Sequence, residues 1–144
     1  MTDKIINVLL VEDDIDDCNF FKTALAGIPL LTSLSILRDG DLMIDFLKKN
    51  EYMLPDIIFL DLSMPRKTGI ECLSDIKEIE QFKNIPVVML STSYTGSSNF
   101  EPILIKSIMG LGAFDFIRKP DTIKSLQHSI YKLIQQVTNL HPKD

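Results

Sequence analysis

Residues 56–69 read DIIFLDLSMPRKTG, and this stretch decides the fold of the chain. The segment 56–60 is short and apolar nearly throughout, as expected for a strand that is covered on both faces of a parallel sheet. Asp61 follows it directly, and Pro65 and Gly69 mark the turn that comes next. In an open α/β sheet the functional crevice lies beyond the carboxyl ends of the strands, so Asp61 stands where a functional side chain is expected.

Four further apolar runs alternate with helical patterns along the chain. The runs are residues 5–11 (IINVLLV), 34–37 (LSIL), 86–90 (PVVML) and 113–117 (AFDFI). Apolar residues recur at helical spacing within residues 18–25, 42–47, 70–79, 100–109 and 126–137. This alternation predicts right-handed crossovers and an α/β fold with a doubly wound, five-stranded parallel sheet that carries helices on both faces.

Length and composition are those of one globular domain. The chain has 144 residues, of which 45% are hydrophobic. We therefore expect a single domain over residues 1–144, with a core from about 4 to 137 and no output domain. The net charge of −5 and the lack of a basic stripe argue against direct nucleic-acid binding. Because no segment reaches transmembrane length and the N-terminus lacks a signal peptide, we expect a cytoplasmic protein without membrane association.

Several residues that could carry chemistry are more simply explained as structural. Cys18 and Cys72 lie on apolar helix faces without a metal-type spacing, which favours buried, reduced thiols. Asp14 is expected to cap the first helix. His128 and His141 are expected at the surface, on a helix and in the C-terminal tail.

Charged or hydroxyl side chains follow four of the five predicted strands. They are Glu12, Asp13 and Asp14 after the first strand, Asp61 after the third, Ser91 after the fourth and Lys119 after the fifth. Because the carboxyl ends of parallel strands meet at one edge of a sheet, we expect these side chains to converge. This convergence, rather than any single residue, indicates a functional site.

Glu12, Asp13 and Asp61 would repel one another at such short range unless their pKa values rise or a cation lies among them. Oxygen ligands without histidine or thiolate suit Mg²⁺, which keeps several waters and uses one or two carboxylates. If all three acids are ionised, their negative charge is balanced by Mg²⁺ together with the ammonium group of Lys119. The residues therefore predict a magnesium site.

Aspartate is a known nucleophile toward phosphorus and forms an aspartyl-phosphate. Mg²⁺, Lys119 and Ser91 could each hold one equatorial oxygen of a phosphoryl group on Asp61. Inward movement of Ser91 would free space behind the fourth strand, into which Phe116 could turn. Phosphorylation would then repack the face formed by the fourth and fifth strands, which makes the domain a switch.

Four motifs follow one another along the chain: VLLVEDD (8–14), IIFLDLSMPRKTG (57–69), PVVMLST (86–92) and GAFDFIRKP (112–120). They resemble those of the response-regulator receiver family, the CheY-like phosphoacceptor domains of two-component signalling. The resemblance spans residues from about 4 to 137 and implies the CheY-like, flavodoxin-like strand order 2-1-3-4-5. It also implies Mg²⁺-dependent uptake of a phosphoryl group and signalling by the resulting conformational change.

The resemblance implies a role for each residue at the strand ends. By position, Glu12 and Asp13 match the acidic pair that holds Mg²⁺, and the backbone carbonyl of Ser63 matches a further metal ligand. Asp61 matches the phosphoacceptor and Lys119 matches the family's lysine. Ser91 matches the switch hydroxyl and Phe116 the switch aromatic. The peptide bond before Pro120 is implied to be cis. No enzymatic activity is implied beyond the domain's own phosphorylation and dephosphorylation.

The implied partner is a sensor histidine kinase or a phosphotransfer protein, whose phosphohistidine is the phosphoryl donor. A phosphorylation-dependent homodimer is a further expectation. Within the family the chain most closely resembles stand-alone receivers of the phytochrome-partner and gliding-bacterium type, through DLSMPRKTGIECL (61–73) and STS (91–93). One departure is the segment 93–107, which predicts an enlarged loop before the fourth helix, the family's usual output surface.

Three other functions compete with this interpretation. A phosphatase of the haloacid-dehalogenase class shares the aspartate nucleophile and Mg²⁺, but it needs an acid two residues later, where this chain has Ser63. A flavodoxin-like FMN carrier needs a phosphate loop after the first strand, where this chain has three acids. A receiver that binds partners without phosphorylation is disfavoured because all the matched residues are present.

Overall fold

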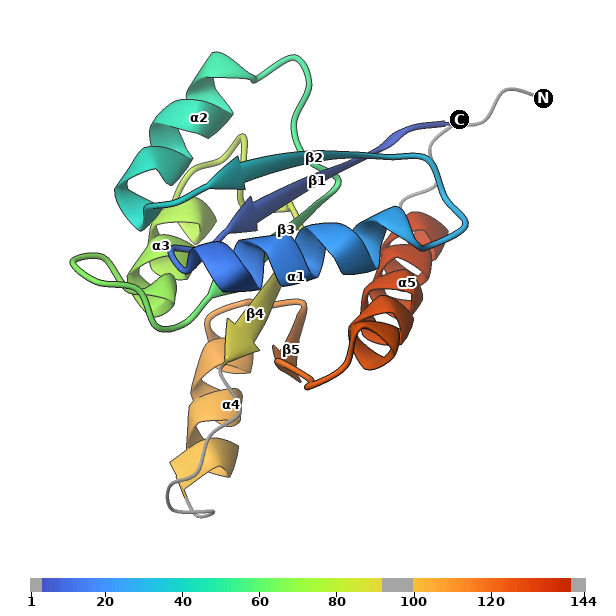
Figure 1. Cartoon of the computed structure of the whole chain (residues 1–144). Helices are drawn as coiled ribbons and strands as arrows, with labels where there is room; N and C mark the ends of the chain where they lie inside the picture. Colours follow the sequence, from blue (N-terminus) through green and yellow to red (C-terminus); the bar gives the residue numbers. More distant parts are fainter. Residues whose placement is uncertain (1–3, 92–99, 141–144) are drawn as a thin grey trace.

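The computed structural model describes residues 4–91 and 100–140, which form a parallel sheet flanked by helices (Figure 1). The strands are β1 (Ile6–Val11), β2 (Thr32–Leu37), β3 (Ile57–Asp61), β4 (Val87–Ser91) and β5 (Asp115–Arg118). The helices are α1 (Ile15–Ala26), α2 (Met43–Lys49), α3 (Gly69–Lys77), α4 (Phe100–Gly110) and α5 (Ile123–Leu140), and a 3₁₀ turn, η1 (Gly40–Leu42), precedes α2. All strand pairs are parallel and the order is β2-β1-β3-β4-β5, which confirms the predicted fold class and strand order.

Two apolar layers enclose the sheet. Val8 and Leu10 of β1 belong to the layer shared with α1 and α5, whereas Leu9 and Val11 belong to the layer shared with α2, α3 and α4 (Figure 1). This division follows from the alternation of side chains along a strand. Both faces of the central strands are therefore buried, which explains why their sequences are continuously apolar.

The parallel register brings the carboxyl ends of the strands to one edge of the sheet. Backbone hydrogen bonds continue this register past the strand ends: the N–H of Glu12 donates to the carbonyl of Leu37 at 2.9 Å, and the N–H of Lys119 donates to that of Ser91 at 2.7 Å. Asp61 is the last residue of β3 on the same edge. The backbone thus fixes where the acids and the lysine leave the sheet.

The starts of β2 and β5 differ from the predicted runs by two residues, and the other strand boundaries differ by at most one residue. The predicted run at 34–37 lacks Thr32 and Ser33, which belong to β2 because an edge strand pairs on one side and need not be apolar throughout. β5 begins at Asp115 rather than at residue 113. The reason is the turn at Gly112, whose φ of 104° delays the start of the ladder.

Helix starts and buried thiols agree with the sequence. Asp14 caps α1 by accepting a hydrogen bond from the N–H of Asp17, as predicted. Thr68 and Glu71 form a reciprocal capping box that begins α3. Cys18 and Cys72 are both buried and free, which confirms the expected reduced thiols.

Some predictions fall on residues outside the described ranges. Of the segment 93–107, residues 100–107 belong to α4, whereas residues 93–99 lie outside the described ranges, so the length of the predicted loop is not tested. His141 lies within 141–144 and is not tested either. Among the described residues, His128 on α5 is exposed, as expected. None of the helices in the described part of the chain combines the length and hydropathy that a membrane crossing requires.

Gly69, the first residue of α3, lies directly against the end of β3. A Cβ atom at this position would lie 2.3 Å from the carbonyl oxygen of Asp61, which is closer than real Cβ contacts come. The N–H of Gly69 also donates to the carbonyl of Leu62 at 3.1 Å. The two ends of the loop 62–68 therefore touch through backbone atoms alone.

Replacement of Gly69 by alanine is expected to lower the free energy of unfolding by about 3 kcal/mol, because the added methyl group must displace backbone rather than a flexible side chain. Urea unfolding followed by circular dichroism measures this change. Gly110→Ala is the matched control, since a Cβ there has no neighbour within 4 Å among the described residues. The control should be neutral or stabilising by up to about 1 kcal/mol. Equal effects of the two substitutions would contradict the contact at Gly69.

Candidate functional site

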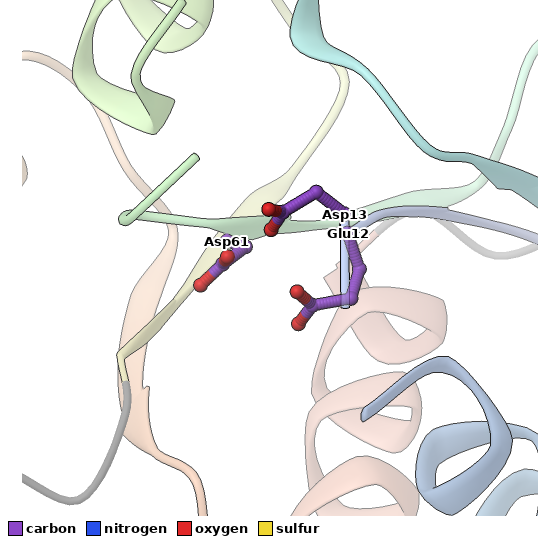
Figure 2. A group of neighbouring side chains, drawn as sticks. All are labelled: Glu12, Asp13 and Asp61. Carbon is purple, nitrogen blue, oxygen red and sulfur yellow. The ribbon is translucent and has the colours of Figure 1, made fainter. Parts of the chain in front are cut away.

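Three carboxylates from two strand ends meet at the carboxyl edge of the sheet, and their side chains point toward a common space (Figure 2). Glu12 and Asp13 directly follow β1, and Asp61 ends β3. One carboxylate oxygen of each residue lies within 4.8 Å of one from each of the others. Glu12 and Asp61 are buried and Asp13 is half-buried. The convergence of these three acids, predicted from the strand ends, is confirmed.

Local hydrogen bonds fix the turn from β1 into α1. The N–H of Asp14 donates to Oε2 of Glu12 at 3.2 Å, while the Asp14 side chain accepts the N–H of Asp17 at 3.0 Å. From the end of β2, Arg38 donates through Nε and Nη2 to the backbone carbonyl of Asp13, at 3.2 and 2.7 Å. These bonds hold the Glu12 side chain and the Asp13 backbone in place.

Lys119 brings a positive charge into this group from the end of β5. Its Nζ donates to Oε1 of Glu12 at 2.6 Å and to Oδ2 of Asp17 at 2.9 Å. The same Nζ lies 3.3 Å from Oδ1 of Asp61, and 16% of the lysine side chain is exposed. Lys119 is therefore the cation among the carboxylates that the sequence predicted, and it links β5 to β1, β3 and α1.

The implied cis bond before Pro120 is wrong for this structure, which has no cis peptide bond among its described residues. The trans isomer of an X–Pro bond is favoured intrinsically by about 0.5–1 kcal/mol. Lys119 reaches the carboxylates from a backbone with a trans bond, so its ion pairs do not require the cis isomer.

Oδ1 of Asp61 is buried and has no hydrogen-bond partner among the described residues. The Nζ of Lys119 lies at ion-pair distance from it but without hydrogen-bond geometry. A buried carboxylate oxygen is normally hydrogen-bonded, and an exception calls for an explanation such as an ion or a catalytic role. This oxygen is therefore the atom of the site that is most suited to a metal ion or a reacting group.

The pKa values report a surplus of buried negative charge. Burial raises the pKa of Glu12 to about 7; the hydrogen bond from Lys119 opposes this rise and the charge of Asp61 adds to it. Burial also raises the pKa of Asp61, although Lys119 opposes the rise. Burial lowers the pKa of Lys119, but its hydrogen bonds to Glu12 and Asp17 outweigh this effect and the net pKa is raised. A divalent cation would relieve this imbalance.

The donor set fits a hard divalent cation. Within the described residues the cluster consists of the carboxylates of Glu12, Asp13 and Asp61, without nitrogen or thiolate ligands. The thiol of Cys18, although near, donates to the carbonyl of Glu12 at 3.4 Å. The backbone of Ser63 acts on the Asp61 carboxylate and lowers its pKa, but the carbonyl of Ser63 as a metal ligand stays a prediction.

Ser91 and Phe116, the predicted switch residues, lie on neighbouring strands. Ser91 is half-buried at the end of β4, and its carbonyl accepts the N–H of Lys119 at 2.7 Å. Phe116 is opposite Met89 in β4 and packs, half-buried, against the apolar layer shared with α4. Phe116 thus lies in β5, the strand that leads to Lys119, and Ser91 lies at the end of the neighbouring strand β4. The switching roles of both residues stay predictions.

Two residues of the site were missed from the sequence. Asp17 looks like an ordinary acid in the first turn of a helix, where negative charge is generally favourable. Arg38 looks like a polar residue that ends an edge strand. No sequence signal sets Asp17 apart from Asp16, since both are acids in the first turn of the helix that Asp14 caps. Nor does any signal identify Arg38, because its contact depends on how β2 pairs with β1.

In metal-free protein, Glu12 is expected to make the free energy of unfolding fall as the pH rises from 5 to 7.5. Its folded-state pKa of about 7 lies above the ordinary value of 4.5, so the folded state binds more protons in this window. The stabilisation is complete below pH 4.5 and is lost as the pH rises through 7, by on the order of 2 kcal/mol. Urea unfolding in EDTA at both pH values measures it.

Glu12→Gln should remove this part of the pH dependence, because the amide does not titrate. Glu51→Gln is the matched control, since Glu51 is exposed and should leave the dependence unchanged. An identical difference between pH 5 and pH 7.5 in wild type and Glu12→Gln would show that Glu12 is not the titrating group.

Curated relatives of the chain include a response regulator and protein-glutamate methylesterases. The family model of the response regulator receiver domain matches residues 8–131. Response regulator Rcp1 of Synechocystis sp. is 41% identical over 91 residues, which cover 60% of this chain and 62% of Rcp1. A protein-glutamate methylesterase/protein-glutamine glutaminase of Bacillus subtilis is 34% identical over 133 residues, which cover 92% of this chain and 34% of that protein. The chain thus spans less than two thirds of the length of these relatives.

Solved structures share the fold over nearly the whole chain. The phosphorylated cyanobacterial phytochrome response regulator RcpA has a TM-score of 0.75 and 30% identity, with 98% of both chains covered. The Mn²⁺-bound form of response regulator Rcp1 has a TM-score of 0.70 and 28% identity, with 96% of this chain and 97% of that chain covered. The chain belongs to the response regulator receiver domain family, whose general role is signalling driven by phosphorylation.

Proposed function

We propose that this chain accepts a phosphoryl group on Asp61 and signals through the resulting change in the β4–β5 face. Receiver domains of this family are generally phosphorylated by histidine kinases and bind Mg²⁺ or Mn²⁺ at an acidic pocket. For this chain, the proposal is carried by Asp61 itself. It is a buried carboxylate at the end of β3, with one oxygen that lacks a hydrogen bond among the described residues and lies 3.3 Å from the Lys119 ammonium group.

In the proposed step, a carboxylate oxygen of Asp61 forms a bond to phosphorus while the bond between phosphorus and the donor breaks. The donor is a phosphohistidine of a sensor histidine kinase or of a phosphotransfer protein, whose imidazole nitrogen keeps the electron pair of the broken bond. Lys119 and the hydroxyl of Ser91 donate to two of the phosphoryl oxygens. Their contribution is to stabilise negative charge that the neighbouring carboxylates would otherwise repel.

Glu12, Asp13, Asp61 and the backbone carbonyl of Ser63 would hold Mg²⁺. When bound, the ion supplies positive charge beside the transferred group. The close approach of the three carboxylates and the raised pKa values of Glu12 and Asp61 support this assignment. The ion and the Lys119 ammonium group together balance three ionised carboxylates, so that the site admits an anionic phosphoryl group.

Phosphorylation changes this balance, since a phosphoryl group carries a charge of about −2 near neutral pH. Movement of Lys119 and Ser91 toward the phosphoryl group offsets the added charge. The backbone hydrogen bond between these two residues supports a coupled movement of β4 and β5. Phe116 is half-buried rather than enclosed in the core, which supports its role as the aromatic side chain that turns when Ser91 moves.

We assign this chain a signalling role and not an enzymatic one, with chemistry confined to its own phosphorylation and dephosphorylation. The net charge of −5 supports a protein partner rather than direct contact with nucleic acid. A phosphorylation-dependent homodimer and a cytoplasmic location are parts of the same proposal. The methylesterase activity of longer relatives is not carried over to this chain.

Incubation with Mg²⁺ and acetyl phosphate is expected to add about 80 Da to the protein, the mass of one phosphoryl group. Here the carboxylate of Asp61 bonds to phosphorus and acetate leaves. Asp61→Asn should abolish the adduct because an amide is a far weaker nucleophile, and EDTA should prevent it in wild type. Intact-protein mass spectrometry measures both results.

Asp45→Asn is the matched control for this experiment. Asp45 is an exposed carboxylate on α2 that does not belong to the three-carboxylate cluster, and its replacement should leave the adduct unchanged. Persistence of the adduct of about 80 Da in Asp61→Asn would refute the assignment of the nucleophile.

Lys119→Ala is expected to permit slower phosphorylation but to uncouple it from the structural response, because the cation that moves toward the phosphoryl group is gone. Amide NMR shifts of β4 and β5 before and after phosphorylation measure the response. Lys124→Ala, an exposed lysine of α5, removes the same charge and should respond like wild type. Wild-type shift changes in phosphorylated Lys119→Ala would contradict the role of Lys119.

A further inference from the structure

Asp17 on α1 is a third acidic partner of Lys119, and it differs from the other two. Its Oδ2 accepts a hydrogen bond from Nζ of Lys119 at 2.9 Å. Glu12 and Asp61 belong to the three-carboxylate cluster that fits a metal ion, whereas Asp17 does not. The side chain of Asp17 is 38% exposed, whereas those of Glu12 and Asp61 are 0% and 3% exposed. Asp17 therefore acts on the lysine and not on the cluster.

The ammonium group of Lys119 has three N–H donors. Two of them are engaged by Glu12 at 2.6 Å and by Asp17 at 2.9 Å, while Asp61 lies at 3.3 Å without hydrogen-bond geometry. The ammonium group is thus drawn to the α1 side of the site, away from the Asp61 oxygen that lacks a hydrogen bond among the described residues. Of the two hydrogen bonds that hold the Lys119 ammonium group on the α1 side, Asp17 accepts one.

The position of this ammonium group is set by ion pairs rather than by tight packing. A cavity of about 220 Å³ lies between α1 and the residues that follow β5, and its lining includes Asp17, Phe20, Lys119 and Pro120. Because the side chain of Lys119 borders open space on this side, loss of one ion-pair partner leaves it free to move. Asp17 is itself held firmly, since its backbone N–H is fixed by the cap residue Asp14.

We propose that Asp17 is a positioning residue that holds the Lys119 ammonium group on the α1 side of the site and thereby slows phosphorylation of Asp61. This inference rests on the proposed function. Phosphorylation requires Lys119 to turn toward a phosphoryl oxygen, and the hydrogen bond to Asp17 opposes that movement. Asp17 also cancels part of the lysine's positive charge, which lowers its attraction for an anionic phosphodonor.

The test compares Asp17→Asn with Asp16→Asn in the full chain. Asp16 lies in the same first turn of α1, is exposed, and forms no ion pair with Lys119 among the described residues, so its replacement controls for net charge and for the helix terminus. With Mg²⁺ and acetyl phosphate, we expect Asp17→Asn to raise the rate of adduct formation about three- to fivefold, the range expected for loss of one partly exposed ion-pair partner. Asp16→Asn should leave the rate unchanged.

A double-mutant comparison separates positioning of Lys119 from other effects. If Asp17 acts through Lys119, then Asp17→Asn should have no effect on the rate in a Lys119→Ala background. An equal rate increase with and without Lys119 would overturn the proposal. So would equal rates in Asp17→Asn and Asp16→Asn, or slower phosphorylation in Asp17→Asn than in wild type.

A second readout needs no phosphorylation. In metal-free protein with EDTA, Asp17→Asn should lower the Tm by about 2–4 °C because a largely buried ammonium group loses a partner. The same substitution should leave the Tm unchanged in the Lys119→Ala background, and Asp16→Asn should be neutral in both. Equal Tm values for wild type and Asp17→Asn would contradict a stabilising hold of Asp17 on Lys119. If wild type forms no adduct, the proposed function fails, while this Tm comparison still decides whether Asp17 holds Lys119.

Discussion

The site depends on the sharing of one ammonium group by carboxylates at a buried sheet edge. Glu12 and Asp61 have almost no exposed surface, so solvent cannot screen their mutual repulsion. The Nζ of Lys119 lies within 3.3 Å of both and offsets part of it. The compensation is incomplete, because the carboxyl groups keep raised pKa values. The site therefore favours binding of a further cation. Once a cation is bound, the site can also accept an anionic phosphoryl group.

The fold provides this arrangement through backbone pairing rather than through side-chain packing. β1, β3 and β5 end at the same edge because parallel register aligns them, and backbone hydrogen bonds extend the alignment to Glu12 and Lys119. Apolar layers on both faces make this register difficult to shift, since a slip of one residue would send buried side chains to the wrong layer. The backbone pairing and the apolar layers therefore hold the carboxylates close together, and neither of them depends on these charges.

Sequence patterns predicted the features that periodicity determines and failed where tertiary contacts decide. The buried strands and the acids at their ends could be predicted, because burial on both faces leaves an apolar run and the strand end fixes the next residue. The start of β2 was missed because Thr32 and Ser33 lie in an edge strand. Asp17 and Arg38 were missed because their roles arise only when α1 meets β5 and when β2 pairs with β1. Periodicity carries no information about such contacts.

The loop between β3 and α3 is closed at its base by backbone contact, since Gly69 leaves no space between itself and the carbonyl of Asp61. The loop is also anchored by side chains, since Met64 is buried in the apolar layer shared with α2 and α3 and Arg66, with a φ of 65°, pairs with Asp39. A shift of the first turn of α3 would press directly on the carbonyl of Asp61. The geometry of the nucleophile therefore depends on the position of α3 as well as on the pairing of β3.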